Sequence, residues 1–90
     1  MEFTWDQKKA VFNFSKHKVS FEEAKTVFDD SLYLDFFDPD HSHDEERYII
    51  AGKSISNRLL LVSYVERGNA IRLISAREAT RRERKDYEEG

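Results

Sequence analysis

Two apolar runs in the second half of the chain dominate its hydrophobic pattern. Residues 59–65 and 70–76 are the longest apolar segments, and they flank the sequence Glu66-Arg67-Gly68-Asn69. Aliphatic and β-branched residues on either side of a glycine-containing turn predict a β-hairpin. Because strands that are covered on both faces read as nearly continuous apolar runs, we expect this hairpin to form the centre of a sheet.

Two earlier segments, residues 32–37 and 47–54, also predict strands. The polar loop 38–46, which holds the only proline, separates them, and a turn at residues 56–57 leads into the hairpin. Three consecutive hairpin-like connections predict a four-stranded antiparallel meander. Residues 3–5 are a candidate for an additional short edge strand.

Helix-start signals predict three helices. Asp6 is a suitable N-cap for a helix that ends near Lys16. Two capping boxes, in which Ser or Thr precedes Glu by three residues, predict helices over residues 21–28 and 81–88. The residues of these two boxes are Ser20 with Glu23 and Thr80 with Glu83. Together with the strands, these helices predict a single α+β domain over residues 1–90, with the helices on one face.

Spacing assigns two faces to the first helix. We expect Ala10, Val11 and Phe14 to face the core, because they follow helical periodicity. The opposite, polar face then carries Lys9, Asn13, Lys16 and His17. The last predicted helix is different, because Tyr87 is its only bulky apolar residue and it cannot bury a broad apolar face.

Composition limits the class of protein. The chain is 39% hydrophobic and 37% charged, it contains no cysteine, and no apolar run approaches the roughly 20 residues that span a bilayer. These features favour a cytoplasmic protein without a membrane partner. The net charge is −3, but residues 58–90 hold eight Lys and Arg against six Asp and Glu. A local basic patch is therefore available for a phosphate-rich partner.

His17 is the first candidate for chemistry. The ordinary pKa of histidine suits proton transfer near neutrality, and the neighbouring Lys9 and Lys16 would attract phosphate. The alternative is structural, because cations at a helix C-terminus interact favourably with the helix dipole.

Arginines form the second candidate group. Guanidinium forks suit phosphate oxygens and the charge of a pentacoordinate transition state. Arg72 and Arg77 lie within or directly behind an apolar strand, where a charge needs a partner or a wet cleft. The alternative is a solvated surface, which explains the last helix more easily. The full set is Arg58, Arg67, Arg72, Arg77, Arg81, Arg82 and Arg84.

Two weaker candidates remain. Glu66 and Arg67 would place an acid and a base at the hairpin tip, or they are simply polar turn residues. The loop 38–46 is rich in Asp, Glu and His, which are ligands for divalent metals, but its spacing matches no known metal site. We therefore favour a solvated loop and expect neither a metal nor a cofactor.

Several segments taken together resemble the BrnT family over nearly the whole chain. These segments are Trp5-Asp6, Lys9, Asn13, Lys16-His17, residues 19–24, residues 46–48, residues 64–68, residues 71–77, residues 79–84 and Tyr87-Glu88. Lys18, Asn57, Val65 and Asn69 depart from the residues usual in the family, which has Gly in place of Lys18.

The resemblance implies a ribonuclease toxin of a type II toxin–antitoxin system with a RelE-like fold. It also implies an RNA substrate, inhibition of translation and neutralisation by a BrnA-like antitoxin that binds the operator DNA, so that the toxin would reach DNA only indirectly. On this basis we expect His17 or Glu66 to transfer protons during metal-independent cleavage. The charge would be stabilised by Arg67, Arg72 and Arg77, and the RNA backbone held by Lys9, Lys16 and Arg81. The alternative is a non-catalytic module that binds the antitoxin as a co-repressor.

Overall fold

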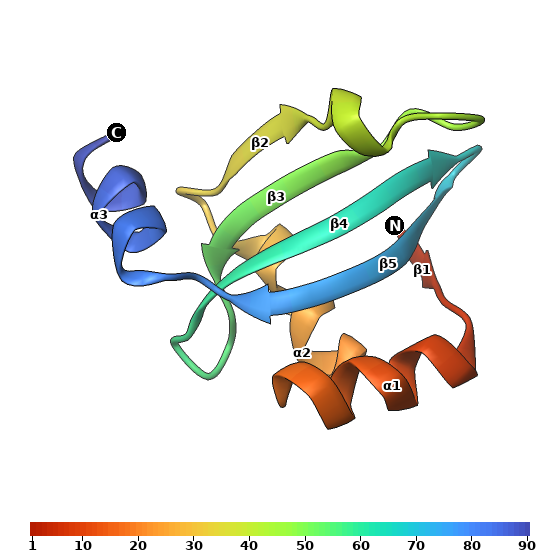
Figure 1. Ribbon diagram of the computed structural model, residues 1–90, viewed down its shortest axis with the longest axis horizontal. Coiled ribbons are helices and arrows are strands. Elements are labelled where there is room, and N and C mark those ends of the chain that lie inside the picture. Colours follow the sequence, from red (N-terminus) through yellow and green to blue (C-terminus); the bar gives the residue numbers. More distant parts are fainter.

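A five-stranded mixed sheet carries the fold, with the strands in the order β1-β5-β4-β3-β2 (Figure 1). The computed structural model describes all residues from Met1 to Gly90. In chain order, the elements are β1 (Glu2–Thr4), α1 (Gln7–His17), α2 (Phe21–Ala24), η1 (Lys25–Asp29), β2 (Leu34–Phe37), η2 (Pro39–His41), β3 (Tyr48–Lys53), β4 (Leu59–Arg67), β5 (Ala70–Glu78) and α3 (Arg81–Glu89).

The α+β class and the antiparallel order of β2 to β5 are confirmed, whereas a purely antiparallel four-stranded sheet is wrong. The N-terminal residues form the fifth strand, which pairs in parallel with β5 from Glu2↔Ala70 to Thr4↔Arg72. No hairpin joins these two strands, so their relative direction is set by the path of the chain through all the intervening helices and strands and not by a local turn.

The core lies between one face of the sheet and the segment α1–α2–η1 (Figure 1). Phe21, Ile50, Leu60 and Leu73 are among its fully buried side chains. Burial of such a side chain contributes about 1.5–3 kcal/mol. Aromatic rings extend the core toward the hairpin, because Phe28 contacts both Phe3 and Tyr64 edge to face at centroid distances of 5.1 Å.

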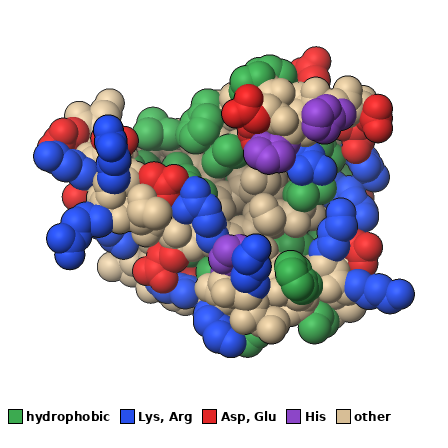
Figure 2. Space-filling view, in the orientation of Figure 1, with side chains coloured by type: hydrophobic (Ala, Val, Ile, Leu, Met, Phe, Trp, Pro, Cys, Tyr) green, Lys and Arg blue, Asp and Glu red, His purple; other side chains and the backbone are tan.

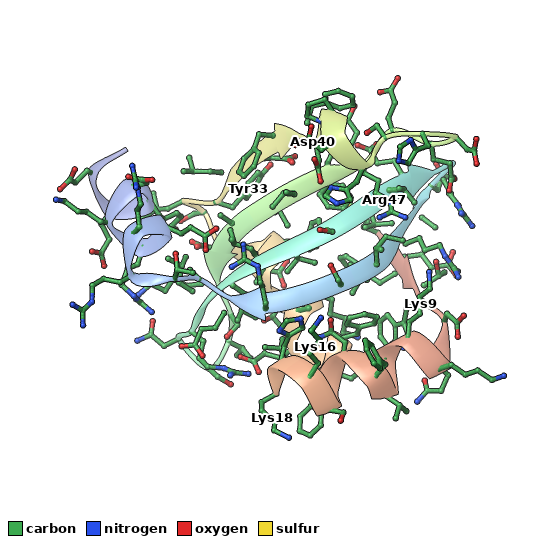
Figure 3. The ribbon with its side chains drawn as sticks, viewed as in Figure 1. Lys9, Lys16, Lys18, Tyr33, Asp40 and Arg47 are labelled. Carbon is green, nitrogen blue, oxygen red and sulfur yellow. The ribbon has the colours of Figure 1, made fainter.

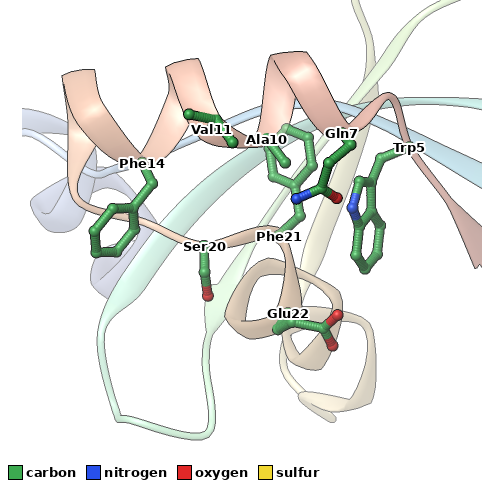
Figure 4. A pocket seen from close by; sticks show the side chains of 8 residues that line it. All are labelled: Trp5, Gln7, Ala10, Val11, Phe14, Ser20, Phe21 and Glu22. Carbon is green, nitrogen blue, oxygen red and sulfur yellow. The ribbon is translucent and has the colours of Figure 1, made fainter.

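The face predicted for α1 is only partly correct. Val11 and Phe14 are 63% and 51% exposed, so they do not enter the core. They line a shallow apolar pocket of about 330 Å³ together with Trp5 and Phe21 (Figure 4). The helix packs against the rest of the protein through Ala10 and Asn13 instead, which lie on one face of α1 about one turn apart.

Asn13 is a buried structural residue and not part of a polar surface. Its Nδ2 donates hydrogen bonds of 2.9 Å to the carbonyl oxygens of Val19 and Ala76, and its Oδ1 accepts one of 3.0 Å from the Ala76 N–H. Since β1 pairs with β5 only as far as Arg72, the edge of β5 is open at Ala76. Asn13 occupies this open edge and thereby fixes α1 against the sheet.

The remaining helices begin as predicted. Ser20 and Thr80 accept hydrogen bonds from the backbone N–H groups of Glu23 and Glu83, respectively. The helix predicted over residues 21–28 is a short α-helix that continues as the 3₁₀ helix η1. α3 lies beyond the end of the sheet, apart from α1 and α2 (Figure 1). None of the helices combines the length and the apolar character that crossing a membrane requires.

Candidate active site

The face of the sheet opposite the core forms an open groove of about 520 Å³. Its floor follows from strand alternation and register, since Ile49, Ser63 and Ser75 lie side by side on β3, β4 and β5. Ile74 is the extra residue of a β-bulge, because Ser63 pairs with Ser75 whereas Tyr64 pairs with Leu73. The bulge brings both Ile74 and Ser75 to the groove.

Charged side chains from separate parts of the chain surround this floor. His17 comes from the end of α1, His41 from η2, Arg47 from the residue before β3, and Arg77 from β5. Figure 2 shows basic and histidine side chains around a hollow in the middle of this face. The residues that line the groove are His17, Asp38, His41, Arg47, Ile49, Leu61, Ser63, Ile74, Ser75, Ala76 and Arg77.

Arg77 is held in place by the last helix. Its two terminal nitrogens donate hydrogen bonds of 2.8 Å to the two carboxylate oxygens of Glu83. The Arg77 guanidinium is the main reason that the pKa of Glu83 is lowered to about 2. In return, the Glu83 carboxylate raises the pKa of Arg77. Both groups therefore stay charged at physiological pH, and the Arg77 guanidinium, with a side chain 41% exposed, keeps unused N–H groups beside the groove.

The opposite wall of the groove carries an oriented histidine. His41 Nδ1 lies 2.9 Å from Asp38 Oδ2, and because a carboxylate accepts, the Nδ1–H donates this bond and fixes the orientation of the ring. Arg47 follows in the same wall. It takes part in none of the ion pairs of the structure, and its backbone N–H is fixed by Ser42 Oγ at 2.8 Å.

The hairpin tip does not reach this groove. Arg67 lies six residues along β4 from Leu61, the partner of Arg77, which corresponds to about 20 Å. Its guanidinium forms a bidentate ion pair with Glu45, at 2.6 and 2.8 Å. Glu66 is exposed beside it. The structure therefore brings together His17 and Arg77 but leaves Glu66 and Arg67 apart from them.

The other basic candidates lie around the groove and not in its lining. Arg72 pairs with Val65, which shares the face of Leu61 and Ser63, so it lies on the groove face toward the hairpin tip. Lys9 and Lys16 extend from α1 on the β5 side, and Arg47 lies across the strands from them (Figure 3). Arg81 is exposed at the start of α3.

Arg58 has a structural role. Its guanidinium makes two hydrogen bonds to Glu23 and one to the carbonyl oxygen of Lys18, so it ties the start of β4 to α2. No group of three or more His, Cys, Asp or Glu side chains is placed to hold a metal ion, in the loop 38–46 or elsewhere.

Arg47 and the pair Asp38–His41 were missed as groove residues in the sequence. Alternation across residues 47–54 could have placed the Arg47 side chain on the same face of the sheet as Ile49 and on the other face from Ile50. Nothing in the sequence indicates that the loop 38–46 turns back over the open face of the sheet. That path depends on contacts such as the bond from the Asp38 N–H to the Arg47 carbonyl, at 2.8 Å.

Two imidazoles and two guanidinium groups around a floor with serine hydroxyls define the class of site. Such a groove can bind a phosphate diester, stabilise additional negative charge on it and move a proton at either wall. The protein is thus an α+β domain with a candidate phosphodiester-binding groove on its open sheet face.

The comparisons identify the family. The family model described as "Ribonuclease toxin, BrnT, of type II toxin-antitoxin system" matches residues 5–83, and the chain belongs to this family. The crystal structure of the Brucella abortus ribonuclease toxin BrnT, at 1.1 Å resolution, shares the fold with a TM-score of 0.66 and 21% identity. The match covers 90% of this chain and 99% of that one. No curated relative matches the chain. The resemblance to BrnT is confirmed, and membership of a type II system implies an antitoxin partner.

Proposed function

We propose that this toxin cleaves RNA in the open groove by a metal-independent reaction. The ribose 2′-OH attacks the adjacent phosphorus, the P–O5′ bond breaks, and the products are a 2′,3′-cyclic phosphate and a 5′-OH. The observation that carries the proposal is the convergence of His17, His41, Arg47 and Arg77 on one groove from four separate parts of the chain. The family supplies the reaction class, since its members are described as ribonuclease toxins.

The groove suggests a division of roles. A base must take the proton of the 2′-OH, and an acid must give one to the leaving 5′-oxygen. His17 and His41 lie on different walls of the groove, so each can serve one side of the phosphate. Arg47 and Arg77 stabilise the charge that develops on the non-bridging oxygens.

The surrounding cations would guide the strand into the groove. Lys9 and Lys16 on α1, Arg72 on the groove face and Arg81 on α3 remain proposed contacts to the RNA backbone. Glu66 and Arg67 keep their predicted catalytic roles only if a second site exists at the hairpin tip, because the groove contains neither.

The wider biology is also part of this proposal. We expect RNA cleavage to inhibit translation in the cytoplasm, and a BrnA-like antitoxin to neutralise the toxin. Operator DNA would be bound through the antitoxin and not by the toxin itself. A common origin with RelE-type toxins would account for the small α+β architecture.

The proposal is tested by matched arginine variants. We expect Arg77→Ala to lower the rate of RNA cleavage by about 100-fold, the usual effect of removing one preorganised donor from a transition state. Arg82→Ala is the control, because Arg82 is exposed on α3 and outside the groove. Circular dichroism at rising temperature checks that both variants fold. Activity that survives excess EDTA supports the metal-independent reaction, whereas activity lost in EDTA and restored by Mg²⁺ contradicts it.

A second function is favoured by one observation. Arg58, Arg67 and Arg77 each donate a pair of hydrogen bonds to a carboxylate of the same chain. Such pairing suits a non-catalytic module that binds its antitoxin as a co-repressor. Glu83→Gln separates the two functions, because it removes the negative charge that pairs with Arg77. A cleaving enzyme will change its rate, whereas a binding module will show no cleavage before or after the substitution.

A further inference from the structure

β2 is an open edge of the sheet. It is the last strand in the order and pairs only with β3. The Asp38 N–H donates to the Arg47 carbonyl directly opposite it, so hydrogen-bonded pairs alternate from that point along β2. By this alternation, Leu34 and Phe36 bond inward to β3. The N–H and C=O groups of Asp35 and Phe37 point outward, where they have no strand to pair with.

The same edge exposes a run of apolar side chains. The exposed fractions of Leu32, Tyr33, Leu34, Phe36 and Phe37 lie between 42% and 75%. In Figure 2, hydrophobic side chains lie along the upper margin of the molecule, where Figure 1 places β2. Natural edge strands usually carry Lys or Pro at such positions, because a free apolar edge invites pairing with another chain.

The negative charge around this edge favours a basic partner. Residues 29–46 contain eight Asp and Glu but no Lys or Arg. Asp30 accepts hydrogen bonds from two backbone N–H groups and the Tyr87 hydroxyl, and Asp35 accepts from the Tyr64 hydroxyl. Neither carboxylate forms an ion pair. Of the eight acidic residues, only Glu45 pairs with an arginine and only Asp38 with a histidine.

These charges exclude two occupants of the edge. A second copy of the chain would pair β2 with β2 and bring the two acidic segments together, which is unfavourable. RNA would be repelled for the same reason. A chain with apolar side chains alternating with Lys and Arg would instead match both the exposed apolar residues and the charge.

We propose that the antitoxin adds an extended, basic segment to the outer edge of β2 as a sixth strand. This inference rests on the proposed antitoxin partner and identifies the surface that it occupies. Leu34 and Phe36 share the groove face, because they pair with Ala51 and Ile49, and Ile49 lines the groove. An added strand would therefore lie next to side chains on the groove face of the sheet. It would bring the antitoxin close to the groove that we propose for RNA cleavage.

Hydrogen exchange provides the most specific test. In the free toxin, we expect the amides of Asp35 and Phe37 to exchange rapidly and those of Leu34 and Phe36 to be protected by their hydrogen bonds to β3. In a complex with the protein encoded next to this gene, we expect protection of the Asp35 and Phe37 amides to rise at least about tenfold. If these two amides exchange equally fast in the free toxin and in the complex, the added strand is excluded.

A matched pair of variants tests the side chains. Phe36→Ser should raise the dissociation constant of the complex by about tenfold or more. Ile55→Ser is the control, because Ile55 is 83% exposed but lies outside β2, in the turn between β3 and β4. Raising the salt concentration from 50 to 500 mM should weaken binding several-fold if opposite charges meet.

The outcomes separate this inference from the proposed function. If the neighbouring protein inhibits RNA cleavage but Phe36→Ser binds as tightly as Ile55→Ser, the antitoxin stands and its place on β2 is wrong. If that protein neither binds nor inhibits the toxin, the proposed antitoxin is wrong and the inference falls with it.

Discussion

Replacing Asn13 with Ala tests how the groove is assembled. The side chain is only 4% exposed, and all three of its hydrogen bonds go to backbone groups. Asn13→Ala leaves the N–H and C=O of Ala76 and the C=O of Val19 without these partners. Each unsatisfied buried polar group costs about 1–3 kcal/mol, and water that enters the space left by the amide reduces the total cost for the three backbone groups. We therefore expect a loss of about 3 kcal/mol in the free energy of unfolding.

Urea and thermal unfolding followed by circular dichroism measure this effect. For a domain of this size, a loss of 3 kcal/mol corresponds to a fall in Tm of about 15 °C. Ser15→Ala is the control, because Ser15 is exposed on the same helix, and it should change the stability by less than about 0.5 kcal/mol. A loss below about 1 kcal/mol for Asn13→Ala would refute the reasoning, since water would then replace the amide without penalty.

Two further predictions concern stability. Lys18 caps α1 in the left-handed region at φ 59°, a backbone conformation that is strained for residues other than glycine. Lys18→Gly should therefore stabilise the protein by about 1 kcal/mol in urea unfolding, and an unchanged or lower stability would show that this strain is absent. The pKa of Glu83 is lowered from its ordinary 4.5 to about 2 by Arg77, so its contribution to stability is present above pH 4.5 and is lost as the pH falls toward 2. Glu83→Gln should remove that part of the acid dependence, and an identical pH profile for both proteins would show that the ion pair contributes nothing.

Local signals predicted most of the elements. The caps at Asp6, Ser20 and Thr80 act within one helical turn, and the Gly68 turn is fixed by its own φ of 61°. Such interactions are visible in the sequence because both partners are close along the chain. The sequence also indicates where Arg77 lies, because this charged residue directly follows the apolar run 70–76.

Long-range contacts account for the parts that were wrong. Asn13 looks like a surface residue by its polarity, but its partner Ala76 is 63 residues away. The parallel pairing of β1 with β5 is equally remote in sequence. Glu66 and Arg67 are near Arg77 along the chain, yet the hairpin carries them to the opposite end of the sheet.

The central claim is that the groove breaks RNA with the 2′-OH as nucleophile, and the products test it most directly. We predict that the purified toxin converts an RNA oligonucleotide into fragments that end in a 2′,3′-cyclic phosphate, as measured by mass spectrometry. The same oligonucleotide with a 2′-deoxy sugar at the cleaved position should stay intact there. Cleavage at the deoxy position, or RNA that stays whole in the absence of antitoxin, would contradict the account.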